Sequence, residues 1–213
     1  VTYKVGAPGR HWIMNSLAVL GAVHAVEGDL GLAGLALAEM APVQGRGQRH
    51  RVALGPRSAF WVIDESYNAN PASMRAALAT LGNSTPGSRN IRSGAGKGGS
   101  AGKGRRIAVL GDMMELGEAS PRFHAELVDP IIETGIDLVV TVGRMMACLA
   151  KALPGHLHLG HVDSAEAAMD LLRPCIEPND VIMVKGSQSM GMAKIVERLK
   201  ALGEKHSKKT ATG

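Results

Sequence analysis

Aromatic side chains are scarce in this sequence of 213 residues, at 3% of the composition. Proteins that bind single-stranded nucleic acid stack the bases on aromatic side chains, so this scarcity argues against such a partner despite the formal net charge of +5. Much of the positive charge also falls in two local stretches, a Gly-rich run over residues 97–106 and the residues from 205 onward. We interpret both stretches as solvated segments and predict no nucleic-acid partner.

Cysteines and long apolar runs are also few. Cys148 and Cys175 are the two cysteines, and without Cys-x-x-Cys spacing we expect reduced thiols in a cytoplasmic protein. No run approaches the roughly 18 apolar residues of a membrane span, and no signal peptide precedes the first predicted element, so no membrane partner is expected. The sequence opens on Val1 in strand-like composition, and we interpret it as part of a longer protein.

Three cofactor signatures are missing. Lys97 and Lys103 each follow a glycine, but neither has the second glycine and the Ser or Thr that a phosphate-binding loop requires. No Gly-x-Gly-x-x-Gly follows the first predicted strand, so a dinucleotide is not implied. His156, His158 and His161 cluster without a cysteine or carboxylate at ligand spacing, and they predict a surface loop rather than a metal site.

Short apolar runs alternate with helical patterns from residue 49 onward. The predicted strands are residues 51–54, 59–63, 106–110, 137–142, 156–159 and 181–184. Helices are predicted from residue 71, over 121–134, 145–152 and 165–172, and after residue 190. This alternation predicts an α/β domain over residues 46–203, a Rossmann-like, doubly wound and mostly parallel sheet with helices on both faces.

Other segments flank or interrupt the predicted domain. A first helix should place Ile13, Leu17 and Leu20 on one face, and a second helix should cover residues 30–40. The Gly-punctuated stretch 42–47 is the predicted boundary between residues 1–45 and the sheet domain. Residues 83–104, rich in Gly, Ser and Lys, predict a flexible insertion, and residues 204–213 predict a disordered tail.

The stretch from Phe60 to Leu78 carries the strongest local signal. A β-rich run ends in Asp64 and Glu65, and a polar turn leads to Asn70, a predicted N-cap, and Pro71, a predicted first helical residue. Strand, acidic turn and helix in this order are typical of ligand sites at the carboxyl edge of an open α/β sheet.

Two further strands end in polar segments of the same kind. The strand over residues 106–110 leads to Asp112 and Glu115, whose carboxylates could hold an amino group or could cap the following helix. The strand over residues 181–184 leads to Lys185 and Ser187 at the start of a helix, where a cation and free N–H groups predict an anion site.

Four segments resemble one family in chain order. Gly-x-His-x-x-x-Asn within residues 9–18, DESYNANP at 64–71, VLGDMMELG at 109–117 and KGSxxxxM from residue 185 resemble motifs of the Mur ligases, in the branch that adds D-alanyl-D-alanine to a peptidoglycan precursor. The resemblance implies that residues 1–45 close a central ATP-binding domain. It also implies that Asn15 contacts adenine and that Arg46 contacts phosphate.

The resemblance assigns further roles. Either Asp64 or Glu65 would bind the ribose of ATP, because Glu65 stands where the family has a second aspartate. The residues expected to contact the dipeptide are Tyr67, Asn68, Asn70, Asp112, Glu115, Lys185 and Ser187. Of these, Lys185 and Asp112 are the predicted catalytic residues.

The implied reaction is ATP-driven amide bond formation in cell wall synthesis. UDP-N-acetylmuramoyl-tripeptide is activated as an acyl phosphate and attacked by the amine of D-alanyl-D-alanine, with Mg²⁺ stabilising the phosphates. The family's phosphate-binding loop and magnesium-holding acid lie in a portion that these residues do not include, so this chain alone is predicted to be inactive. The alternatives are a sister Mur ligase, a folylpolyglutamate synthase or a non-catalytic Rossmann-like binding module.

Overall fold

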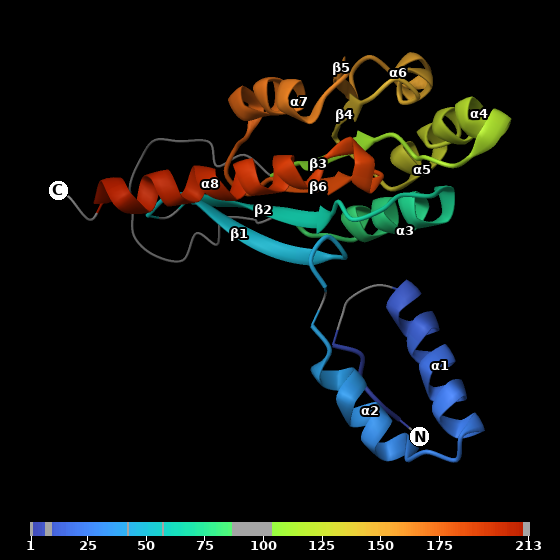
Figure 1. The fold of residues 1–213 in the computed structure, drawn as a ribbon. Coiled ribbons are helices and arrows are strands. Elements are labelled where there is room, and N and C mark those ends of the chain that lie inside the picture. The colour runs from blue at the N-terminus through green and yellow to red at the C-terminus, as the bar shows by residue number, and fades with distance from the viewer. Residues whose placement is uncertain (1, 7–9, 42, 57, 87–103, 211–213) are drawn as a thin grey trace.

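The computed structural model describes residues 2–6, 10–41, 43–56, 58–86 and 104–210 (Figure 1). A six-stranded sheet with the strand order β1-β2-β6-β3-β4-β5 forms its centre. The strands are β1 (Gln48–Gly55), β2 (Ser58–Glu65), β3 (Arg106–Gly111), β4 (Leu138–Val142), β5 (His158–Val162) and β6 (Val181–Lys185). β1 runs antiparallel to β2, whereas every other neighbouring pair is parallel. The predicted mostly parallel sheet is therefore confirmed.

The central strands are buried on both faces, as a parallel sheet requires. All five residues of β6 are buried, and β3 is buried from Ile107 to its end. β5 begins two residues later than predicted, and its pairing with β4 is interrupted by a bulge between Val139 and Val140. Histidines are poor evidence for the start of an apolar strand, which explains the misplaced boundary.

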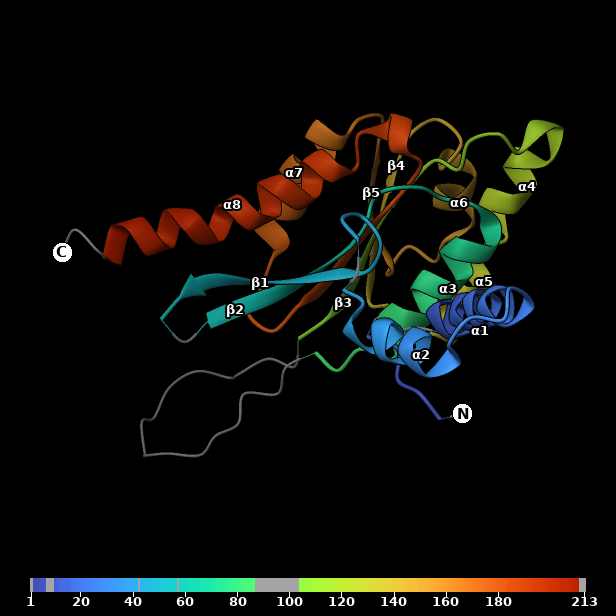
Figure 2. The ribbon, with the colours of Figure 1, turned by 60° about the horizontal axis from the view of Figure 1, so that its bottom comes forward.

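Helices cover both faces of the sheet, which confirms the doubly wound α/β architecture (Figure 2). One face carries α3 (Pro71–Gly82), α4 (Ser120–Ala125), α5 (Val128–Glu133) and α6 (Ala147–Ala152), and the other carries α7 (Ala165–Leu172) and α8 (Ala193–Thr210). Met74, Leu78 and Leu81 anchor α3 in the first core. Ile195 and Leu199 anchor α8 in the second.

Two predicted helical boundaries are wrong. The helix predicted over residues 121–134 is divided into α4 and α5, because Pro130 has no N–H to donate to the carbonyl of residue 126 and so cannot continue α4. The tail predicted to be disordered from residue 204 continues α8 as far as Thr210. The lysines and the glutamate of residues 204–210 are compatible with a helix, and α8 projects past the edge of the sheet (Figure 1).

Two helices, α1 (Arg10–Ala25) and α2 (Leu30–Glu39), form a hairpin apart from the sheet (Figure 1). Asp29 begins α2, since its side chain accepts hydrogen bonds from the backbone N–H groups of Gly31 and Leu32. The apolar face predicted for α1 is largely exposed: Ile13 and Leu17 are each 51% exposed. Helix α1 is instead buried at Ser16, whose hydroxyl lies 2.8 Å from that of Tyr3.

The amino edge of the sheet is fastened by two arginines. The buried carboxylate of Asp180 accepts hydrogen bonds from the backbone N–H and the guanidinium of Arg105. Arg106 donates from Nε to the carbonyl of Ser84 at 3.2 Å. The residues directly after α3 and the beginning of β3 are therefore held together. The insertion predicted over 83–104 falls mostly on residues 87–103, outside the described part of the chain.

None of the helices in the described ranges is both long and apolar enough to cross a membrane.

Candidate functional site

The carboxyl ends of β2, β6 and β3 lie side by side at one edge of the sheet. Glu65, the last residue of β2, is the register partner of Lys185, the last residue of β6. On the other side of β6, Lys185 is paired with Leu110 of β3. The three predicted ligand segments after these strands therefore start from the same edge.

Asp64 ties the linker before β1 to the end of β2. Its buried carboxylate accepts hydrogen bonds from the N–H of Gly45 at 3.1 Å and from the hydroxyl of Ser66 at 2.6 Å. Its backbone carbonyl accepts from the N–H of Gly47 at 2.7 Å. Gly45 has a φ of +72°, and a Cβ there would lie 2.8 Å from the Cβ of Tyr67. Asp64 thus brings the linker against the acidic turn and does not itself line the cavity described below.

Arg46 stacks on Tyr67 where the linker crosses this turn. The guanidinium carbon lies 4.2 Å from the centre of the ring, and the backbone N–H of Tyr67 donates to the carbonyl of Gly45 at 3.1 Å. A cation over an exposed aromatic ring contributes about 0.5–1 kcal/mol. The stack therefore fixes the direction of the guanidinium. Because the stack contributes so little, a ligand can displace the guanidinium from the ring at modest cost.

The start of α3 confirms the predicted cap. Asn70 accepts a hydrogen bond from the backbone N–H of Ser73, while the hydroxyl of Ser73 accepts from the N–H of Asn70, and Pro71 is the first helical residue. The side-chain oxygen of Asn68 accepts from the N–H of Ala69 at 2.8 Å. Both amides thus shape the turn, and both residues line the adjoining cavity.

Lys185 is the buried cation of the site. Its Nζ donates to the backbone carbonyl of Asn68 at 2.8 Å and lies 3.7 Å from Oε2 of Glu65. The exposed fractions of the Lys185 and Glu65 side chains are 3% and 14%. Burial lowers the pKa of Lys185 below its ordinary value, the charge of Glu65 opposes this effect, and the nearby charge of Arg46 adds to it.

These groups surround a cavity of about 460 Å³ between the helical hairpin and the sheet edge. Seven predicted site residues line it, namely Asn15, Arg46, Glu65, Tyr67, Asn68, Asn70 and Lys185. The sequence interpretation missed Trp12, Gly45, Ala69, Ala72, Ser73, Ala76 and Ala77, which also line it. Helical spacing gave a usable signal, because Trp12 precedes Asn15 by one turn and Ala76 follows Ala72 by one turn. Gly9 and the side chain of His11, part of the first motif, lie outside the described part of the chain.

Besides Asp64, three predicted site residues do not line this cavity, namely Asp112, Glu115 and Ser187. The carboxylate of Asp112 accepts from the backbone N–H groups of Met145 and Met146, at 3.1 and 2.8 Å, and so holds the loop before α6 rather than the helix after its own strand. Ser187 accepts from the N–H of Met114 through its hydroxyl at 2.9 Å. Glu115 is exposed and has a φ of +63°.

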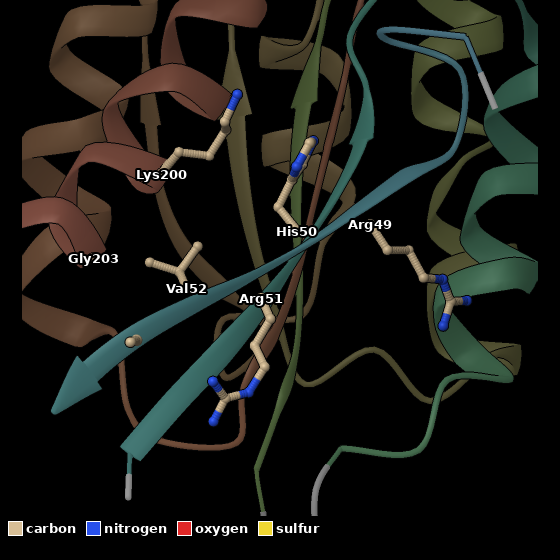
Figure 3. A pocket seen from close by; sticks show the side chains of 7 residues that line it. Arg49, His50, Arg51, Val52, Lys200 and Gly203 are labelled. Carbon is tan, nitrogen blue, oxygen red and sulfur yellow. The ribbon is translucent and has the colours of Figure 1, made fainter. Parts of the chain in front are cut away.

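A second cleft, of about 480 Å³, lies between β1 and α8 (Figure 3). It is lined by Arg49, His50, Arg51, Val52, Ala53, Lys200 and Gly203. Its basic groups do not converge: His50 extends from β1 on the side of α8, whereas Arg49 and Arg51 extend on the other side (Figure 3). Lys200 also forms an ion pair with Glu197 at 2.9 Å. We therefore assign no ligand to this cleft.

The histidines of β5 contact a hydroxyl. Nε2 of His158 and Nδ1 of His161 lie 3.3 and 3.0 Å from Oγ1 of Thr141. Within the described ranges, no three His, Cys, Asp or Glu side chains are grouped so that they could hold a metal ion.

Comparison with known proteins places this geometry in a family. A family model described as "Mur ligase, glutamate ligase domain" matches residues 45–188. The curated UDP-N-acetylmuramoyl-tripeptide–D-alanyl-D-alanine ligase of Mycobacterium leprae is 32% identical over 203 residues, which cover 92% of this chain and 38% of that protein. The enzyme of the same name from Escherichia coli is 30% identical over 198 residues, again 92% of this chain and 38% of the relative. The chain thus spans about two fifths of the length of these relatives.

Solved structures agree in fold. MurF from Acinetobacter baumannii superposes with a TM-score of 0.73 at 23% identity, covering 93% of this chain and 39% of that one. MurF ligase from Thermotoga maritima in complex with ADP gives 0.70 at 21% identity, covering 96% and 42%. With the family model matching well over half of the sequence, this chain belongs to the Mur ligase family.

Proposed function

We propose that this chain is the C-terminal part of an ATP-dependent ligase that joins D-alanyl-D-alanine to UDP-N-acetylmuramoyl-tripeptide in peptidoglycan precursor synthesis. The observation that carries the proposal is the cavity in which Asn15 and Arg46, from the hairpin and the linker, face Glu65 and Lys185 at the sheet edge. The named relatives that cover most of this chain support the choice of substrates. We place the reaction in the cytoplasm, where nucleotide substrates are available.

The nucleotide is proposed to bind on the hairpin side of the cavity. The amide of Asn15 offers a donor and an acceptor that suit the adenine edge. The guanidinium of Arg46 is permanently charged and offers fork-shaped donors that match phosphate oxygens. Both side chains line the same cavity, and residues 1–45 are accordingly proposed to be the end of the central ATP-binding domain.

The dipeptide is proposed to bind on the sheet side. The buried ammonium of Lys185 suits its carboxylate, and Tyr67, Asn68 and Asn70 form the adjoining wall. The side chains that α3 presents to the cavity are small, from Ala72, Ser73, Ala76 and Ala77, and leave space for the two methyl groups of the substrate. Asp112 and Ser187 enter the proposal only as residues that hold neighbouring loops in place.

The proposed reaction transfers phosphate from ATP to the tripeptide carboxylate, after which the dipeptide amine attacks the acyl carbon and phosphate leaves. Magnesium is expected to stabilise the phosphates when bound. The described residues offer no metal-holding group, so we assign magnesium no ligand in this chain. The 213 residues also contain no Gly-x-x-x-x-Gly-Lys-Ser/Thr sequence, so we expect no ATP turnover by this chain alone.

Calorimetry with the purified chain tests the proposal. We expect weak binding of ADP, reduced about tenfold or more in Arg46→Ala, which is the effect of losing a hydrogen bond to a charged group. Arg49→Ala removes a nearby exposed arginine that does not line the cavity and serves as the matched control. Equal loss in both variants, or no heat with either ADP or D-alanyl-D-alanine at millimolar concentration, would count against the proposal and in favour of a non-catalytic module.

A further inference from the structure

Glu65 has a partner at the end of the neighbouring strand, and the ribose-binding role that the resemblance allows for Glu65 does not explain this partner. Because Glu65 and Lys185 are register partners at the ends of β2 and β6, their side chains leave the sheet next to each other. Oε2 of Glu65 lies 3.7 Å from Nζ of Lys185, and both side chains are largely shielded from water. The pair therefore interacts in a medium of lower dielectric constant than a surface ion pair does.

We propose that Glu65 is a positioning residue: it holds the ammonium of Lys185 charged and directed into the cavity, where that ammonium receives the carboxylate of the substrate. This inference rests on the proposed function for the identity of the ligand, but not for the Glu65–Lys185 interaction itself. It also gives the two adjacent acids separate roles, because the carboxylate of Asp64 accepts hydrogen bonds from Gly45 and Ser66 whereas that of Glu65 lies next to Lys185.

The contacts of Lys185 leave room for a ligand. An ammonium has three donors. One is used by the carbonyl of Asn68 at 2.8 Å, and a second is directed within reach of Glu65. The carbonyl and the carboxylate together fix the long side chain, so the entropic cost of ordering it is met before the ligand arrives.

The side chains around Lys185 show why the carboxylate of Glu65 is needed to keep the ammonium charged. The charged or titratable side chains that line the cavity with it are Glu65, Arg46 and Tyr67. Burial lowers the pKa of Lys185, and Arg46 lowers it further, whereas Glu65 raises it. When the charge of Glu65 is removed, burial and the charge of Arg46 still favour the neutral amine. Glu65 then no longer favours the ammonium. A neutral amine would no longer attract a carboxylate.

Two variants and one control test the inference. Glu65→Gln keeps the size of the side chain and removes its charge, while Glu65→Asp keeps the charge on a shorter side chain. Glu166→Gln breaks a comparable but exposed ion pair, in which Glu166 lies 3.3 Å from Lys194. The titration of Lys185 is followed by NMR through its ¹³Cε signal, which is identified by its loss in Lys185→Arg. Circular dichroism checks that each variant is folded.

We expect the titration midpoint of Lys185 to fall in Glu65→Gln, to recover at least in part in Glu65→Asp, and to stay unchanged in Glu166→Gln. Binding of D-alanyl-D-alanine, measured by calorimetry, should weaken in Glu65→Gln about tenfold or more and should fail at a lower pH than in the unmodified chain. An unchanged Lys185 midpoint in Glu65→Gln overturns the inference. Weakened ADP binding in the same variant would then indicate that Glu65 binds the ribose. If the midpoint falls but no variant binds the dipeptide, the positioning role stands and the proposed function fails.

Discussion

Replacement of Asp64 by asparagine tests whether this acid holds the linker in place or binds the nucleotide. The substitution keeps the shape of the side chain, and it removes one of the two acceptor oxygens. The remaining oxygen can still accept the hydrogen bonds from Ser66, which both go to Oδ1. The new NH₂ group would then face the N–H of Gly45, which now donates to Oδ2 at 3.1 Å.

The expected loss follows from these contacts. A hydrogen bond to a charged acceptor contributes about 1.5–3 kcal/mol, and Asp64 is buried with 3% exposure, so solvent does not screen it. We expect Asp64→Asn to lower the free energy of unfolding by about 1.5–3 kcal/mol through the Gly45 contact alone. Asp64→Ala, which also removes the two bonds from Ser66, should cost more than Asp64→Asn.

Urea unfolding followed by circular dichroism measures the effect. With a slope of about 2 kcal/mol per molar urea, the midpoint of Asp64→Asn should fall by about 0.8–1.5 M. Asp170→Asn, an exposed aspartate on α7, is the control and should leave the midpoint unchanged. The reasoning is refuted if Asp64→Asn unfolds at the same urea concentration as the unmodified chain while its affinity for ADP falls, because Asp64 would then be a ligand.

The remaining predictions concern the turns around the cavity and the buried lysine. Asn70→Ala should destabilise the chain by about 1 kcal/mol in urea unfolding, the cost of losing an N-cap, and no change would mean that the cap of α3 is unimportant. Gly143→Ala should lower the free energy of unfolding by about 1–3 kcal/mol, because φ is +102° and the new Cβ would lie 2.7 Å from Cγ of Asp112. Gly155→Ala, where the new Cβ has no such neighbour, is the control, and equal urea midpoints for the two variants would contradict the prediction. Because the pKa of Lys185 in the folded state is lowered, the unfolded chain binds more protons between that pKa and the ordinary value of 10.5, so the free energy of unfolding should rise with pH over this interval. Lys185→Met should remove that rise, and identical pH slopes for both chains would show that Lys185 is not penalised by burial.

The sequence was sufficient where local chemistry decides the structure. Asn70 and Pro71 begin α3 as predicted, since an N-cap and a first-turn proline act within a few residues. The helix predicted over residues 165–172 also has these bounds, and the side chain of Ser164 caps it by accepting from the N–H of Ala167. The buried strands β3 and β6 were recognisable as short apolar runs. Of the seven predicted residues that line the cavity, six lie in segments that resemble the family, and Arg46 lies in the linker.

The sequence was insufficient where a contact joins distant residues. Asp64 and Glu65 are adjacent acids, and only the register of β2 with β6 shows that Glu65 meets Lys185. Asp112 looks like a ligand in the sequence, yet its acceptor oxygens are used by N–H groups 33 and 34 residues further along. The exposed face of α1 could not be predicted either, because helical periodicity identifies an apolar face but not what covers it.

The hydrogen bond between Arg106 and Ser84 has a practical consequence for protein engineering. The two ends of the stretch that separates α3 from β3 are joined by a hydrogen bond of 3.2 Å, and Arg105 is anchored independently on Asp180. The span between these ends therefore does not have to be a particular number of residues. Doubling the length of such a closed stretch costs only about 0.6 kcal/mol, so a fluorescent label or an affinity peptide spliced in there should leave the sheet and the distant cavity unaltered.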